Sequence, residues 1–119
     1  MSSPRHELWL CNILSWDILR NHAGAFLACP DWVSARGMRM LAAPMKGDPA
    51  VVSGESGAVG MGVIDALMTD PAYSELKAAL ELNGDSRVLL FSTEGDTDPE
   101  NYRRIVWGGA YPTIEDEGR

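Results

Sequence analysis

Apolar positions recur with the period of an α-helix in five stretches of the chain. Local signals set the expected boundaries. Ser15 is a candidate N-cap, Pro71 and Pro99 suit first helical positions, and Pro44 stops a helix. The predicted helices span residues 15–22, 30–43, 56–69, 71–82 and 99–107. The chain after Gly108 is expected to be frayed.

Three shorter apolar stretches predict strands at residues 25–29, 51–52 and 87–91. The last, Arg-Val-Leu-Leu-Phe, is the clearest, because a short continuous apolar run is typical of a fully buried parallel strand. Strands that alternate with helices indicate an α/β fold. We therefore expect a partial parallel sheet flanked by helices.

The helix over residues 56–69 is apolar on nearly every side, which predicts that it is buried. Gly57, Gly60 and Gly62 lie within it, and each lowers helix propensity by about 1 kcal/mol relative to alanine. Close packing of another backbone or a ligand explains these glycines better than propensity does. Because a three-stranded sheet leaves both edges open, we interpret the chain as a piece of a larger sheet.

Composition narrows the class of protein. Of 119 residues, 45% are hydrophobic and 23% charged, values typical of a globular chain that forms one domain or part of one. The net charge of −7, with scattered Lys and Arg, argues against nucleic acid and anionic membranes as partners. No apolar run approaches the roughly 20 residues of a membrane span, and no secretory h-region is evident. A cytoplasmic location is therefore expected.

Neither cysteines nor acidic residues predict a metal site. Cys11 and Cys29 lack nearby Cys or His pairs, and reduced thiols are the default, with a disulfide between them as the alternative. Glu94, Asp96 and Asp98 lack the ligand spacing of a calcium loop. We expect no metal.

Ser92 follows the predicted strand at residues 87–91, and ligands of open α/β sheets bind beyond the carboxyl ends of strands. Its hydroxyl could donate to a ring nitrogen or accept from one; the alternative is a cap for the next turn. Gly54, Gly57 and Gly60 could form a phosphate cradle at a helix N-terminus, but Glu55 would repel phosphate, so tight packing is the favoured interpretation.

A serine nucleophile is not supported. The segment around Ser56, Gly-Glu-Ser-Gly-Ala, departs from the hydrolase pattern at its last position. His6 and His22 both precede it, whereas hydrolases of that type place their histidine after the serine. We therefore expect no serine nucleophile, and no catalytic residue is assigned in this chain.

Two segments together resemble the fold-type-II pyridoxal-phosphate enzymes. Residues 92–98, Ser-Thr-Glu-Gly-Asp-Thr-Asp, are similar to the Ser-Gly-Arg-Gly-Asp-Lys-Asp segment of the tryptophan synthase β subunit. Residues 53–58 resemble the Glu-Pro-Ala-Gly-Ala stretch of threonine dehydratases. Five segments in order are similar to the C-terminal third of the diaminopropionate ammonia-lyase family: residues 29–33, 36–39, 53–60, 92–98, and 102–103 with 106–107.

The resemblance implies pyridoxal 5'-phosphate as cofactor and an amino acid as substrate. The implied reaction is an α,β-elimination of 2,3-diaminopropionate to pyruvate and ammonia. Ser92 would hydrogen-bond the pyridine nitrogen, and Thr93, Glu55 and Ser56 would line the pocket. Residues 15–112 would form the C-terminal part of the large lyase domain, preceded by a divergent extension (1–14) and followed by an acidic tail (113–119). A homodimer or other self-association is expected.

One departure from the family affects the expected activity. The Schiff-base lysine and the glycine-rich phosphate loop of the family lie far upstream of the matching segments. Lys46 and Lys77 fall in a loop and on a polar helix face. We therefore expect a fragment that is inactive alone. The alternatives are another fold-type-II lyase, such as a serine or threonine dehydratase, and a non-catalytic binding or association module.

Overall fold

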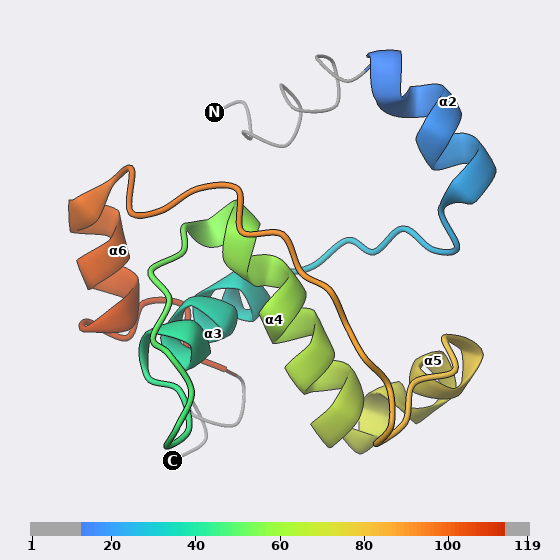
Figure 1. Cartoon of the computed structure of the whole chain (residues 1–119). Helices are drawn as coiled ribbons and strands as arrows, with labels where there is room; N and C mark the ends of the chain where they lie inside the picture. The colour runs from blue at the N-terminus through green and yellow to red at the C-terminus, as the bar shows by residue number, and fades with distance from the viewer. Residues whose placement is uncertain (1–12, 114–119) are drawn as a thin grey trace.

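The computed structural model describes residues 13–113, which form helices joined by turns and extended segments (Figure 1). The five predicted helices are confirmed in position, although the stretch at residues 71–82 divides into a short 3-10 turn and a shorter helix. The elements are α2 (Ile13–His22), α3 (Asp31–Ala42), α4 (Glu55–Thr69), η1 (Pro71–Tyr73), α5 (Ser74–Ala79) and α6 (Pro99–Val106).

Capping residues set the starts of η1 and α6, at the prolines that the sequence predicted in first helical positions. The Asp70 carboxylate accepts a hydrogen bond from the Ala72 amide at 2.9 Å, and the Asp98 carboxylate accepts one from the Asn101 amide at 3.2 Å. A proline follows each cap at the first helical position, where its missing amide hydrogen costs nothing. Ser15 was wrong as an N-cap, because α2 already begins at Ile13.

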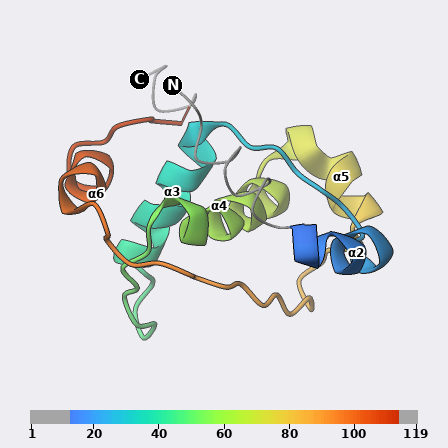
Figure 2. The same ribbon diagram turned by 90° about the horizontal axis from the view of Figure 1, so that it is seen from above.

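Helices α3 and α4 cross in close contact and form the centre of the molecule (Figure 2). A Cβ on Gly37 would come within 2.9 Å of the Gly62 amide nitrogen, and one on Gly62 within 3.0 Å of Val33 Cγ1. An ion pair between Arg36 and Asp65 joins the two helices beside this crossing. The predicted reason for the glycines of α4, close approach of another backbone, is therefore confirmed at Gly62.

The core is small. Ala35, Met38, Ala58 and Ile105 form its buried cluster, which joins α3 and α4 to α6. The predicted burial of α4 is only partial: its fully buried residues are Gly57, Ala58, Gly62 and Leu67, and its other apolar residues are half-buried. The described chain places too few neighbours around α4 to cover all of its apolar faces.

The segment after α6 is held in place rather than frayed. The Arg39 guanidinium donates to the carbonyls of Ile105, Ala110 and Tyr111 at 3.3, 3.1 and 3.4 Å. Gly109 has a φ of +72°, which a residue with a side chain rarely adopts, and Thr113 is buried. The expectation of a frayed tail was therefore wrong for residues 109–113.

The predicted sheet is not formed within residues 13–113. Residues 25–29, 51–52 and 87–91 are extended, but none is assigned to a strand. The clearest prediction, a buried strand at 87–91, is not confirmed within residues 13–113, where Leu89 and Phe91 are 77% and 74% exposed. A strand requires a neighbouring backbone to complete its hydrogen bonds, and the described part of the chain offers this segment a helix surface instead. Figure 1 shows the segment running past α4 between α5 and α6.

Helix α2 lies apart from the other helices, and the exposed residues 23–28 connect it to the rest of the chain (Figures 1 and 2). Trp16 and Leu19 on this helix are exposed. Within residues 13–113 no helix is both long and apolar enough to cross a bilayer. Cys11 lies outside the described residues, so the predicted thiol state of the two cysteines is untested.

Candidate functional site

Two serine hydroxyls meet at the N-terminus of α4. The Ser53 and Ser92 Oγ atoms are 2.7 Å apart, the usual distance of a hydrogen bond between hydroxyls. Ser53 is completely buried, whereas Ser92 is exposed. The Gly54 amide donates to the Glu94 carbonyl at 3.2 Å, which ties the two backbones together beside this hydroxyl pair. Ser92 therefore reaches solvent from a position anchored on the helix.

The glycine spacing of residues 54–60 explains this arrangement. A Cβ on Gly57 would lie 2.6 Å from Ser53 Oγ and 2.9 Å from Ser92 Oγ. A Cβ on Gly60 would lie 2.9 Å from Leu90 Cδ2. The side of α4 that carries Gly57 and Gly60 therefore leaves room for the segment that contains Ser92 to pack closely. Tight packing, the interpretation favoured over a phosphate cradle, accounts for these contacts.

Glu55 fastens α4 to α6. Its Oε1 accepts a hydrogen bond from Asn101 Nδ2 at 2.7 Å, and Asn101 Oδ1 accepts one from the Arg104 guanidinium at 2.8 Å. Arg104 also donates to the Tyr111 hydroxyl at 3.3 Å. This hydrogen bond is the largest cause that raises the pKa of the Arg104 guanidinium, and the Glu55 charge adds to it. Glu55 is therefore committed to a contact between helices.

Ser56 and Thr93 flank these contacts and are exposed. Ser56 follows Glu55 in the first turn of α4, and Thr93 follows Ser92. All four predicted pocket residues thus gather where α4 begins and the extended segment passes it. Ser53 was not among them. Its position between an extended apolar pair and the glycine segment was visible in the sequence, but nothing there indicated that its hydroxyl meets Ser92.

The hydrogen-bond donors of this site fit one part of pyridoxal phosphate, its pyridine ring. An alcohol can donate to the pyridine nitrogen, and Ser92 presents one at the surface. Lys77 belongs to α5, which packs at the end of α4 opposite Ser53, and Lys46 belongs to the turn after α3 (Figure 1). Neither lysine belongs to the segments that form the hydroxyl pair. Among residues 13–113 no cluster of His, Cys, Asp and Glu could hold a metal.

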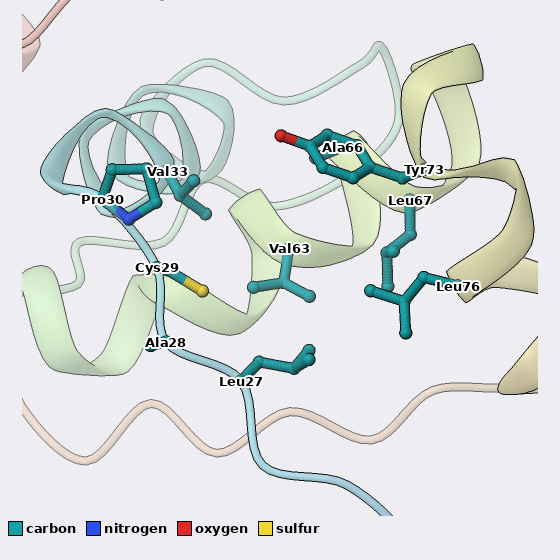
Figure 3. A pocket seen from close by; sticks show the side chains of 10 residues that line it. All are labelled: Leu27, Ala28, Cys29, Pro30, Val33, Val63, Ala66, Leu67, Tyr73 and Leu76. Atoms are coloured by element: carbon teal, nitrogen blue, oxygen red, sulfur yellow. The ribbon is translucent and has the colours of Figure 1, made fainter.

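A hollow lies along the C-terminal half of α4, away from the hydroxyl pair (Figure 3). Its volume is about 110 Å³. Figure 3 shows Val63, Leu67 and Leu76 turned into it, with Cys29 at one side and the Tyr73 ring at its edge. No charged side chain lines it, so it does not suit a phosphorylated cofactor.

Comparison with known proteins identifies the class. No family model matches the chain. Solved structures of fold-type-II pyridoxal-phosphate enzymes match it, with TM-scores of 0.79. They are Escherichia coli diaminopropionate ammonia-lyase in complex with D-serine and the same enzyme with an aminoacrylate–PLP azomethine reaction intermediate. Each is 50% identical to this chain in sequence. The match covers 85% of this chain, and 26% and 27% of the two solved chains.

Curated relatives give the same result. The chain is 51% identical over 100 residues to diaminopropionate ammonia-lyase of Escherichia coli (strain K12), a match over 84% of this chain and 25% of the relative. It is 46% identical over 99 residues to the Salmonella typhimurium (strain LT2) enzyme, covering 82% and 24%. The resemblance found in the sequence is therefore confirmed, and the chain spans about a quarter of the length of these relatives.

Proposed function

We propose that residues 15–112 supply the part of a pyridoxal-phosphate-dependent diaminopropionate ammonia-lyase that contacts the pyridine ring. Two observations support this: 51% identity to such a lyase, and Ser92 held at the start of α4 by Ser53. When bound, the cofactor withdraws electrons from the substrate, so that the α-proton and then the β-amino group can leave. The complete reaction converts 2,3-diaminopropionate to pyruvate and ammonia.

In this proposal the Ser92 hydroxyl hydrogen-bonds the pyridine nitrogen. An alcohol is neutral at physiological pH, so, unlike an aspartate, it leaves the nitrogen largely unprotonated. A less electron-withdrawing ring favours elimination over transamination. Thr93, Glu55 and Ser56 line the same side of the pocket, with Glu55 retaining its bond to Asn101.

We further propose that residues 87–91 become a strand of a parallel sheet when the remainder of the large domain is present. The segment is strongly apolar, and Leu89 and Phe91 are exposed, as side chains that helices on the face of a parallel sheet would cover. Pairing would place Ser92 at the carboxyl end of a strand, where α/β enzymes bind their ligands.

The 119-residue chain alone is proposed to be inactive. Lys46 and Lys77 belong to segments away from Ser92, so neither is placed to hold the cofactor covalently beside it. Pyridoxal phosphate added to the recombinant chain, followed by borohydride, should leave no stable pyridoxyl group on lysine at stoichiometric cofactor. A specific adduct at Lys46 or Lys77, with pyruvate release, contradicts the proposal.

Activity is tested in a grafted enzyme, defined as the Escherichia coli relative with its matched segment replaced by residues 15–112 of this chain. It should release pyruvate from 2,3-diaminopropionate faster than from serine or threonine. Ser92→Ala should lower kcat about tenfold, the effect of one lost hydrogen bond near the top of the usual range. Ser74→Ala, an exposed serine on α5, is the control. A preference for serine or threonine would support a dehydratase instead.

A second candidate, an association module, is supported by the exposed apolar residues of segment 87–91. Such a surface favours self-association, either as a homodimer or through unpaired strand edges. The two candidates differ in what they require of Ser92: the lyase needs its hydroxyl, whereas an association module needs the apolar side chains that precede it.

A further inference from the structure

We infer that Ser53 is a positioning residue that makes Ser92 a hydrogen-bond donor toward the cofactor ring. The inference rests on the proposed function. It concerns a side chain that is completely buried and that cannot itself touch a ligand at the surface. Its influence on the site can therefore pass through Ser92, whose Oγ lies 2.7 Å away.

The hydroxyl pair has two hydrogens and several acceptors. Ser53 Oγ can donate to Ser92 Oγ at 2.7 Å or to the Gly54 carbonyl at 3.2 Å. Ser92 Oγ can donate to Ser53 Oγ or to the Glu94 carbonyl at 3.4 Å. The short contact between the hydroxyls needs one hydrogen, and either serine can provide it.

The two arrangements give Ser92 opposite roles. If Ser92 donates to Ser53, its hydrogen is used, and Ser92 can only accept from a ligand. If Ser53 donates to Ser92, the Ser92 hydrogen is held only by the long Glu94 contact and can turn to a ligand acceptor. An unprotonated pyridine nitrogen is an acceptor. A ring in that state therefore selects the second arrangement, in which Ser53 is the donor.

The backbone around the two serines holds their hydroxyl oxygens close together. The Gly54 amide bonds the Glu94 carbonyl at 3.2 Å, one residue beyond Ser53 and two beyond Ser92. Gly57 has no Cβ, and one added there would lie within 2.9 Å of both hydroxyl oxygens. The chain thus leaves room for a buried hydroxyl at residue 53 and holds it against Ser92.

The first test uses the 119-residue chain and needs no cofactor. Ser53→Ala, Ser92→Ala and the double variant form a cycle in which the unfolding equilibrium is measured with urea. A hydrogen bond between the hydroxyls should give a coupling of about three- to tenfold in the unfolding constant. Additive effects would mean that the two hydroxyls do not interact in solution, and would overturn the inference.

The second test reads the ring nitrogen directly. The grafted enzyme is loaded with pyridoxal phosphate labelled with ¹⁵N in the ring, and its ¹⁵N chemical shift is followed with pH. Ser53→Ala, and Ser53→Cys, which still fills the space but is a weak donor, should both move the shift toward that of Ser92→Ala. Ser74→Ala should leave it unchanged.

The outcomes separate the inference from the proposed function. If Ser92→Ala moves the ring shift while both Ser53 variants match the parent, Ser53 only fills space and the inference fails alone. If Ser92→Ala also leaves the shift unchanged, Ser92 does not contact the ring, and the proposed function fails with it. If Ser53→Cys matches the parent and only Ser53→Ala differs, volume rather than hydrogen bonding is responsible, which likewise overturns the inference.

Discussion

At the scale of single residues, the absence of a side chain shapes the candidate site as much as the hydroxyls do. Gly57 and Gly60 both face the extended segment, but they face different atoms. Gly57 lies against the Ser92 backbone and the hydroxyl pair, whereas Gly60 lies against the end of the flexible Leu90 side chain. The same substitution at these two positions should therefore have different consequences.

Gly57→Ala should lower the free energy of unfolding by about 1–3 kcal/mol, the usual cost of overpacking, because a Cβ there meets Ser53 Oγ at 2.6 Å. Gly60→Ala should be neutral or stabilising by up to about 1 kcal/mol, because alanine favours a helix and Leu90 can move. Urea denaturation measures both. Equal effects of the two substitutions would show that residues 90–92 do not pack on α4 as described.

The residue scale also shows what sequence could foresee of the site. Ser92 and Glu55 were selected from pattern and resemblance, and both lie at the start of α4. The pairing of Ser92 with Ser53 depends on how segments 39 residues apart pack together, which no local pattern encodes. Likewise, Glu55 could not be assigned to Asn101 until α6 was placed beside α4.

At the scale of elements, the crossing of α3 and α4 depends on Gly37 and Gly62. Gly62→Ala should cost about 1–3 kcal/mol or more, because its Cβ would collide with the Val33 backbone, which cannot move without shifting α3. Gly24→Ala is the matched control, since a Cβ at Gly24 meets no atom within 4 Å. Thermal denaturation of the two variants compares them, and an unchanged Tm for Gly62→Ala would contradict the crossing.

Arg39 provides a second test at this scale. Its guanidinium donates to three carbonyls at and beyond the end of α6, so Arg39→Met should cost about 1–3 kcal/mol through unsatisfied acceptors. Arg20→Met removes an exposed contact with Asp17 at 3.4 Å and should change stability by less than about 1 kcal/mol. If both variants unfold at the same urea concentration, Arg39 does not hold the segment after α6.

Helices were foreseen better than strands for a physical reason. A helix closes its hydrogen bonds within one segment, so the local signals at Pro71 and Pro99 sufficed to locate two helix starts. A parallel strand requires neighbours that are distant in sequence. Residues 87–91 have the composition of a buried strand, yet the described chain supplies no strand beside them.

At the scale of the whole molecule, the main feature is an apolar surface that no other part of the described chain buries, at segment 87–91. Leu89→Lys should reduce any self-association of the chain, because it places a charge in the exposed segment 87–91. Met45→Lys, at a site 83% exposed in the loop after α3, is the control. Sedimentation velocity over a range of concentrations measures both. Equal association of the two variants would place the contact elsewhere.

The central claim is that Ser92 contacts the pyridine ring from the end of a strand, and a crystal structure of the grafted enzyme with pyridoxal phosphate tests it most directly. We predict Ser92 Oγ within about 2.7–3.2 Å of the pyridine nitrogen, with residues 87–91 paired in a parallel sheet. A Ser92 hydroxyl turned away from the ring, or a segment 87–91 that is still unpaired, would contradict the account.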